Sequence, residues 1–144
     1  MTPSILAIFF SAYTVQFGLP PNLLSSLCYV ESKHDIAAIH KDDGTTNSVG
    51  ICQVKLKTAV WLGFSGTEKQ LMDPKTNIYY SAKYLSYQLL RYRNNTVNAI
   101  IAYNKGNSKN LQKTKYSDKV LKQWRIFNDR RQCSKNSCER RPQK

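Results

Sequence analysis

The sequence predicts a mainly α-helical protein with a small irregular loop or β excursion around residues 36–54. Apolar residues recur at helical spacings of three and four along most of the chain. The stretch 33–49 is instead polar and rich in turn-forming residues. A length of 144 residues suits one domain. We expect this domain to cover residues 1–127, followed by a basic C-terminal tail over residues 128–144.

Composition excludes several classes of protein. Hydrophobic residues make up 41% of the chain and charged residues 22%, which is typical of a globular protein and not of a fibrous or disordered one. The longest apolar run extends only from Ile5 to Phe10, whereas a bilayer-spanning helix needs roughly 20 such residues. We therefore expect no membrane-spanning helix.

The first expected helix lies close to the start of the chain. Its predicted inward face consists of apolar residues at helical spacing that continue to a glutamine: Ile5, Ile8, Phe9, Ala12, Val15 and Gln16. Gly18 and the pair Pro20-Pro21 mark its end. A signal peptide is the alternative, but no basic residue precedes Lys33, so we favour a structural helix.

Five further helices are expected downstream. They cover about residues 22–32, 56–62, 75–93, 97–103 and 116–127. The longest begins after Asp73-Pro74, a helix-start signal, and its apolar residues are Ile78, Ala82, Leu85 and Leu89. Glu31 lies at the C-terminal end of the helix over 22–32, where the negative end of the helix dipole disfavours a carboxylate. An acid is therefore unusual in that position.

The four cysteines have two interpretations. Cys28 and Cys52 lie in apolar stretches and are predicted to be small buried residues. Cys133 and Cys138 flank a short polar segment that a local disulfide could close. The two histidines, His34 and His40, show no ligand spacing with the cysteines, so no metal site is expected.

Positive charge is concentrated near the C-terminus. The chain has 22 basic and 9 acidic residues and a net charge of +13. The last 40 residues hold 13 of the basic and 3 of the acidic residues, a net +10. Such a surface attracts polyanions, including nucleic acid, anionic lipid and wall polymers. A nucleic-acid-binding module is therefore one hypothesis, although no zinc-finger, RNP or helix-turn-helix pattern accompanies the charge.

Three short segments carry the most specific signal. They are Val30-Glu31-Ser32, residues 48–53, and Ala102-Tyr103-Asn104-Lys105-Gly106. Leu19-Pro20-Pro21 precedes the first, and the stretch from Asp73-Pro74 to Asn77-Ile78 separates the second from the third. In this order the chain, from residue 5 to about 125, resembles the lysozyme-like lytic transglycosylases. Goose-type lysozymes and phage or secretion-system muramidases are wider relatives.

The resemblance implies a lysozyme-like fold with a cleft for peptidoglycan glycan strands. It implies Glu31 as the catalytic acid and base at the β-1,4 bond between N-acetylmuramic acid and N-acetylglucosamine, with no cofactor. Residues implied to bind substrate are Ser32, Ser48, Gln53, Tyr103 and Asn104, the last also supporting the loop beside Tyr103. Cys52 departs from the large apolar residue that the family usually has there.

The chemistry of Glu31 agrees with this role. A glutamate in solution has a pKa of about 4.3 and is ionised at neutral pH. Partial burial and the helix terminus should raise that pKa, so that Glu31 holds a proton for the leaving oxygen. In the resembled family the substrate itself closes a 1,6-anhydro ring. A second acid among Asp35, Asp42 and Asp43 would instead make the protein a hydrolytic muramidase. The presence of Glu31 argues against a wall-binding protein without catalysis.

The expected setting is the cell envelope or periplasm, where a monomeric enzyme would meet its substrate. A phage particle or a secretion machine could deliver it there. The basic C-terminal region is expected to hold the protein on anionic wall polymers or lipid.

Overall fold

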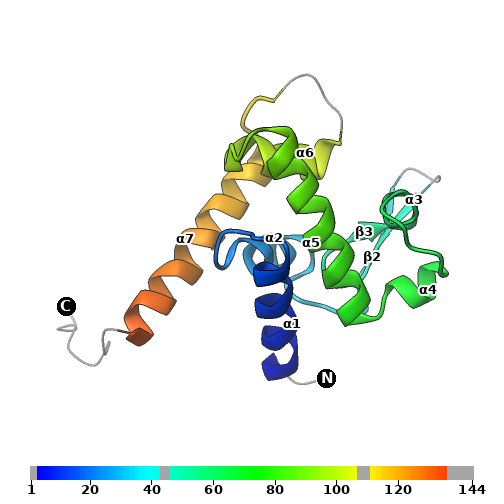
Figure 1. Cartoon of the computed structure of the whole chain (residues 1–144), viewed down its shortest axis with the longest axis horizontal. Helices are drawn as coiled ribbons and strands as arrows, with labels where there is room; N and C mark the ends of the chain where they lie inside the picture. The colour runs from blue at the N-terminus through cyan, green and yellow to red at the C-terminus, as the bar shows by residue number, and fades with distance from the viewer. Residues whose placement is uncertain (1–2, 43–45, 107–110, 136–144) are drawn as a thin grey trace.

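The computed structural model of the chain describes residues 3–42, 46–106 and 111–135. Within them lie seven helices and one antiparallel sheet with strand order β1-β2-β3, so the predicted mainly α fold is confirmed (Figure 1). The elements are α1 (Pro3–Gln16), α2 (Leu23–Ser32), β1 (Ile39–Asp42), β2 (Thr46–Val49), β3 (Val54–Lys55), α3 (Leu56–Trp61), α4 (Glu68–Leu71), α5 (Pro74–Arg91), α6 (Thr96–Lys105) and α7 (Lys115–Lys135).

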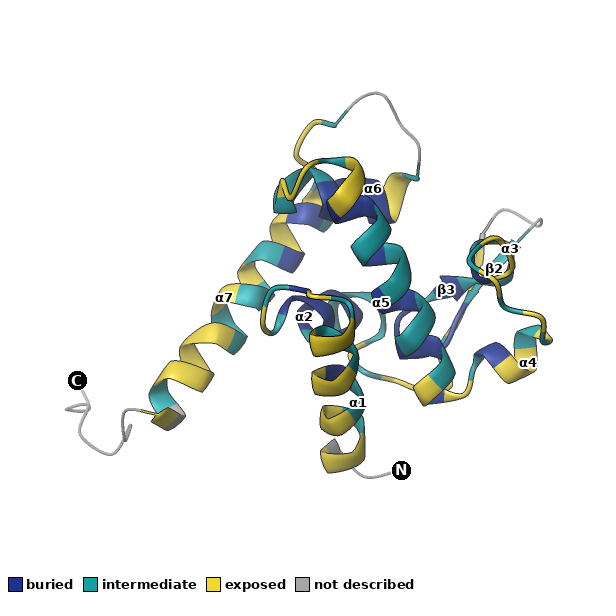
Figure 2. Cartoon of the chain, in the orientation of Figure 1, coloured by how far each residue is buried: buried dark blue, intermediate teal, exposed yellow. Residues whose placement is uncertain are grey.

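The core forms around α2 and α5. Helix α5 packs against α1 and α6, and α2 packs against α7. The sheet, α3 and α4 lie together on one side of α5 and form a smaller lobe (Figure 1). Many of the largest fully buried side chains are apolar residues of α2, α5 and α6, where buried segments meet (Figure 2); among them are Leu23, Leu24, Leu27, Ile78, Leu85 and Ile100. Their burial provides the main driving force for folding.

The three strands lie where the β excursion was expected, except that β3 reaches Lys55. Strand β1 pairs with β2 from Ile39↔Val49 to Asp42↔Thr46, and β2 continues to β3 through Ser48↔Lys55. The chain therefore leaves the end of α2, forms this small sheet and continues directly from β3 into α3.

The predicted helix-start signal at Asp73-Pro74 is confirmed. Asp73 caps α5, because its Oδ2 accepts a hydrogen bond from the Thr76 backbone N–H at 3.0 Å, and Pro74 occupies the first turn. Asn95 caps α6 in the same way, accepting from the Asn98 N–H. Helix α2 ends at Ser32, followed by Lys33 in the left-handed region, which leaves Glu31 in the last turn as expected.

The predicted inward face of α1 is wrong except at Phe9. Ile8 is 63% exposed and Val15 82% exposed, and Ile5, Ala12 and Gln16 also face solvent. The buried side carries Phe10, with four flanking residues packed on the core: Leu6, Phe9, Tyr13 and Phe17. Both faces of α1 are apolar, so periodicity alone could not choose between them; the larger aromatic side chains bury more area and occupy the inside. In the described part of the chain, no helix combines the length and apolarity needed to cross a membrane.

The interpretation of Cys28 and Cys52 is also corrected. Both are fully buried, but they are joined in a disulfide between α2 and the loop that connects β2 to β3. The apolar surroundings explain the burial prediction, whereas the pairing depends on a tertiary approach across 24 positions of sequence. The possible Cys133–Cys138 pairing involves Cys138, which lies outside the described residues.

The C-terminal helix is longer than expected. Helix α7 does not stop near Phe127 but runs on to Lys135, so the first part of the expected tail is helical. Asn128 contributes to this, because its Oδ1 accepts a hydrogen bond from Asn22 Nδ2 at 2.9 Å. Residues 136–144 of the expected tail lie outside the described residues.

Candidate active site

A cavity of about 510 Å³ lies between the smaller lobe and helices α5 and α6. Its volume is typical of small-molecule sites. Five of the six predicted site residues line it: Glu31, Ser48, Gln53, Tyr103 and Asn104. Residues separated by up to 73 positions in sequence thus meet at one surface, while Ser32 is not among the lining residues.

Glu31 reaches the cavity from the last turn of α2 and is partly buried. The hydroxyl of Tyr116, in the first turn of α7, donates a hydrogen bond to its Oε1 at 2.6 Å. Burial, and next the neighbouring Glu31 carboxylate, raise the pKa of Tyr116 well above its ordinary value. Tyr116 therefore stays protonated and remains a donor to Glu31.

Sequence reasoning missed Tyr116. It is one of nine tyrosines and lies 85 positions from Glu31. Its position at the start of a helix gave no sign of the contact, because that contact depends on how α7 packs against α2.

The loop that carries Gln53 is fixed by the buried side chain of Asn77 in α5. Asn77 Nδ2 donates to the Val49 and Leu71 carbonyls, both at 2.9 Å. Its Oδ1 accepts from the Cys52 N–H, also at 2.9 Å. Gly50 lies against this amide with a φ of +81°, and any added Cβ would collide with the Asn77 side chain. The path of residues 49–52 is thus set by one amide group.

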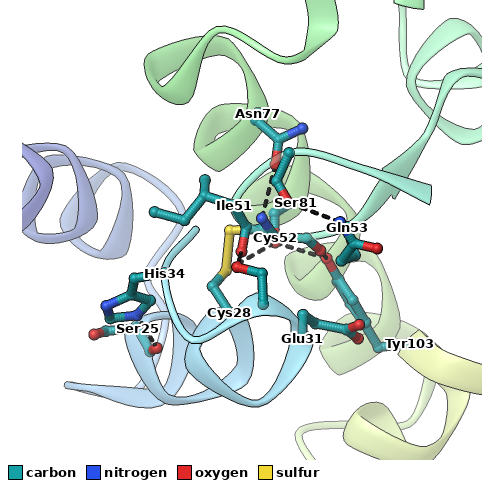
Figure 3. Close-up of a disulfide and its surroundings, with 12 residues drawn as sticks. Ser25, Cys28, Glu31, His34, Ile51, Cys52, Gln53, Asn77, Ser81 and Tyr103 are labelled. Atoms are coloured by element: carbon teal, nitrogen blue, oxygen red, sulfur yellow. Dashed lines mark hydrogen bonds between the residues drawn. A yellow bond between two sulfur atoms is a disulfide. The ribbon is translucent and has the colours of Figure 1, made fainter. Parts of the chain in front are cut away.

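Two further links join this loop to α2. The Cys28–Cys52 disulfide attaches it one turn before Glu31. The Ser32 hydroxyl, directly after Glu31, donates to the Ile51 carbonyl at 2.6 Å. Figure 3 shows Glu31, Gln53 and Tyr103 on the same side of the disulfide. Ser32, expected to bind substrate, instead holds the end of α2 against the loop.

Gln53 lies in the left-handed region with a φ of 52°. Its Nε2 donates to the Gly50 carbonyl at 3.0 Å and to the Ala38 carbonyl at 3.1 Å. These bonds hold the side chain over the loop while the residue lines the cavity. The amide nitrogen is therefore engaged by the protein itself.

Tyr103 is 8% exposed and presents only part of its ring to the cavity. Its hydroxyl donates to the Cys52 carbonyl at 3.2 Å and lies 2.7 Å from Ser81 Oγ. Burial, followed by the nearby Glu31 charge, raises the pKa of Tyr103. This hydroxyl therefore bonds to the loop, and Tyr116 makes the contact with Glu31.

The charges in the cavity are unequal. Among the described residues that line it, Glu31 is the single carboxylate, while Lys55 and Lys105 contribute two cations. Asp35, a candidate second acid, is exposed and accepts a hydrogen bond from the Ala37 N–H. For the other candidates, the structure does not describe the side chain of Asp42 or any of Asp43. The described residues contain no cluster of three potential metal ligands.

The family model of the transglycosylase SLT domain matches residues 8–126. The chain belongs to the transglycosylase SLT domain family. The match confirms the resemblance drawn from the three segments, since it spans all of them, and it also includes Tyr116. Comparison with curated proteins gives no significant match.

Solved structures show a similar fold. An inactive mutant of the lytic transglycosylase Slt from Pseudomonas aeruginosa superposes with a TM-score of 0.72 at 19% sequence identity, covering 89% of this chain and 24% of that one. The 70-kDa soluble lytic transglycosylase in complex with bulgecin A gives a TM-score of 0.62 at 22% identity, covering 85% and 19%. This chain therefore spans about a quarter or less of the length of each of these proteins.

The close contact between Gly50 and the Asn77 side chain predicts that Gly50→Ala is much more destabilising than Gly18→Ala. Both glycines have a positive φ, but nothing lies within 4 Å of a Cβ at Gly18. Gly18→Ala should lower the free energy of unfolding by about 1 kcal/mol, the cost of the left-handed backbone. Gly50→Ala adds the collision with Asn77 and should cost about 3 kcal/mol or more. Urea unfolding of both variants measures the difference, and equal losses would contradict the close fit at Asn77.

Proposed function

We propose that this SLT domain is a lytic transglycosylase that cleaves the β-1,4 bond between N-acetylmuramic acid and N-acetylglucosamine in peptidoglycan. The observation that carries the proposal is the environment of Glu31. It is a partly buried acid with a tyrosine hydroxyl on one oxygen, and it is the single carboxylate among the described residues of the cavity. Membership of the family supports the choice of substrate.

In the first step Glu31 acts as the general acid. Its proton passes to the glycosidic oxygen as the bond to C1 of the muramyl residue breaks. Partial burial and the negative end of α2 both disfavour the ionised form, whereas the Tyr116 hydrogen bond favours it. Tyr116 also fixes the direction of the carboxyl group, because a hydrogen bond at 2.6 Å leaves Oε1 little freedom. We assign it a positioning role.

In the second step Glu31, now a carboxylate, acts as the base. It takes the proton from the muramyl C6 hydroxyl while that oxygen bonds to C1, closing the 1,6-anhydro ring and restoring the acid. No water is consumed in the reaction. Glu31 recovers in this step the number of protons that it gave in the first. A hydrolase would normally need a second carboxylate to hold water, and the described lining residues offer none beside Glu31.

The remaining lining residues suit a glycan. Gln53 has its Nε2 engaged by backbone carbonyls, so its amide oxygen is left as an acceptor for a sugar hydroxyl or acetamido N–H. Ser48 and Asn104 add hydroxyl and amide groups at the same surface. Lys55 and Lys105 add positive charge to the cavity, which suits a substrate with acidic peptide stems.

The cell envelope is the compartment that we propose for this reaction. The buried Cys28–Cys52 disulfide supports it, because disulfides persist in oxidising compartments. Helix α7 carries seven exposed cations and only two acids, and it would attract anionic wall polymers or lipid. Delivery by a phage particle or a secretion machine remains part of the same proposal.

Glu31→Gln tests the catalytic assignment. Because glutamine cannot donate a proton as an acid, cleavage of purified peptidoglycan should fall by about 10³-fold. Asp35→Asn is the matched control, since Asp35 is an exposed carboxylate four positions away that does not line the cavity, and it should retain activity. Mass spectrometry of the wild-type digest should show products that are one water lighter than hydrolysed muropeptides.

Each result can contradict a different part of the proposal. Reducing ends in the wild-type digest would identify a hydrolytic muramidase. Full activity of Glu31→Gln would remove Glu31 from the mechanism, and failure of the wild type to cleave peptidoglycan would overturn the function.

Tyr116→Phe should shift the pH dependence. The Tyr116 hydrogen bond stabilises the ionised form of Glu31, so its removal should raise the pKa of Glu31. Since the reaction begins from protonated Glu31, kcat/KM falls as pH rises through that pKa. The alkaline limb should therefore move to higher pH, by about one unit for a hydrogen bond to a charged group. Tyr103→Phe is the control, because its hydroxyl bonds to the loop. If the alkaline limb of Tyr116→Phe stays at the same pH or moves to lower pH, the positioning role of Tyr116 is contradicted.

A further inference from the structure

We propose that Trp61 and Tyr87 form a second sugar-binding surface that continues the cleft and holds additional saccharide units of the same glycan strand. We call this pair the aromatic platform. The inference rests on the proposed function for the chemistry of its ligand, and it adds a site outside the cavity around Glu31.

A continuous series of ring contacts leads from the cavity to the platform. Tyr103 and Tyr84 both line the cavity, with ring centroids 5.2 Å apart. Tyr84 stacks nearly parallel to Tyr87, at 6.3 Å and an interplanar angle of 10°. Tyr87 then meets the ring of Trp61 edge-on at 4.8 Å. These ring contacts connect the cavity wall to the platform.

The helix faces that line the cavity also continue into the platform. On α3, Thr58 lines the cavity and Trp61 follows it one turn later. On α5, Tyr84 lines the cavity and Tyr87 follows one turn later. Lys83 Nζ donates to the Leu62 carbonyl at 2.7 Å, which ties the end of α3 to α5. These contacts fix the two rings relative to each other, as a preformed binding surface requires.

The exposure of Trp61 indicates what this surface binds. Its side chain is 61% exposed although it is the largest apolar side chain on α3. A sugar ring presents a face of C–H bonds that packs on an indole, and a glycan strand leaving the cavity along α3 and α5 would meet this ring next. Continuity with the cavity is the reason to choose further units of the same strand as the occupant.

The test measures binding to protein that cannot cleave. In the Glu31→Gln background, calorimetry compares a trimer and an octamer of β-1,4-linked N-acetylglucosamine, with and without Trp61→Ala. Loss of the indole should weaken octamer binding about tenfold and change trimer binding less than about twofold. Trp61→Phe, which keeps an aromatic face, should restore most of the octamer affinity.

Val60→Ala is the matched control. Val60 is also exposed and belongs to α3, but it lines a separate hollow with Lys41 and Glu68. It should leave the binding of both lengths unchanged, and thermal unfolding checks that each variant folds.

The outcomes separate this inference from the proposed function. Equal octamer affinity with and without Trp61 would overturn the platform, while peptidoglycan cleavage by the wild type would keep the proposed function. Equal weakening of trimer and octamer would show that Trp61 only supports the cavity, which also overturns the inference. No octamer binding by the protein that retains Trp61 would contradict both.

Discussion

The site depends on one buried amide. Asn77 is fully buried in α5 and satisfies three hydrogen bonds with backbone groups of residues 49, 52 and 71. A buried amide without partners costs roughly 1–3 kcal/mol, so the loop cannot shift without leaving polar groups unpaired. The positions of Gln53 and of the Cys52 carbonyl that receives the Tyr103 hydroxyl follow from this constraint.

The loop that Asn77 holds also determines where Glu31 lies. Helix α2 brings Glu31 to the cavity, and the disulfide and Ser32 attach that helix to the loop that Asn77 holds. On the opposite side, α7 packs on α2 and supplies the Tyr116 hydroxyl. Glu31 thus has a fixed partner and lies on a helix end that is attached to the loop, as electrostatic preorganisation requires for the role that we propose for it.

The sequence predicted much of the fold and part of the site for identifiable reasons. The helix-start signal Asp73-Pro74 acts locally, so the start of α5 was predicted correctly. The three segments placed Glu31, Gln53 and Tyr103 on one cavity because their order is specific. Contacts between distant residues gave no local signal, so the disulfide and the Tyr116 bond were missed. The two apolar faces of α1 competed, and tertiary packing decided between them.

The direct test of this account is native-state hydrogen exchange at the Cys52 amide. Its N–H donates to the buried oxygen of Asn77, in a segment without regular secondary structure. If Asn77 fixes the loop, this amide should exchange only on global unfolding, with protection within about tenfold of that of core amides in α5 such as Leu85. Exchange at the rate of an exposed loop would show that the loop opens locally, and would contradict the claim that one buried amide holds the site together.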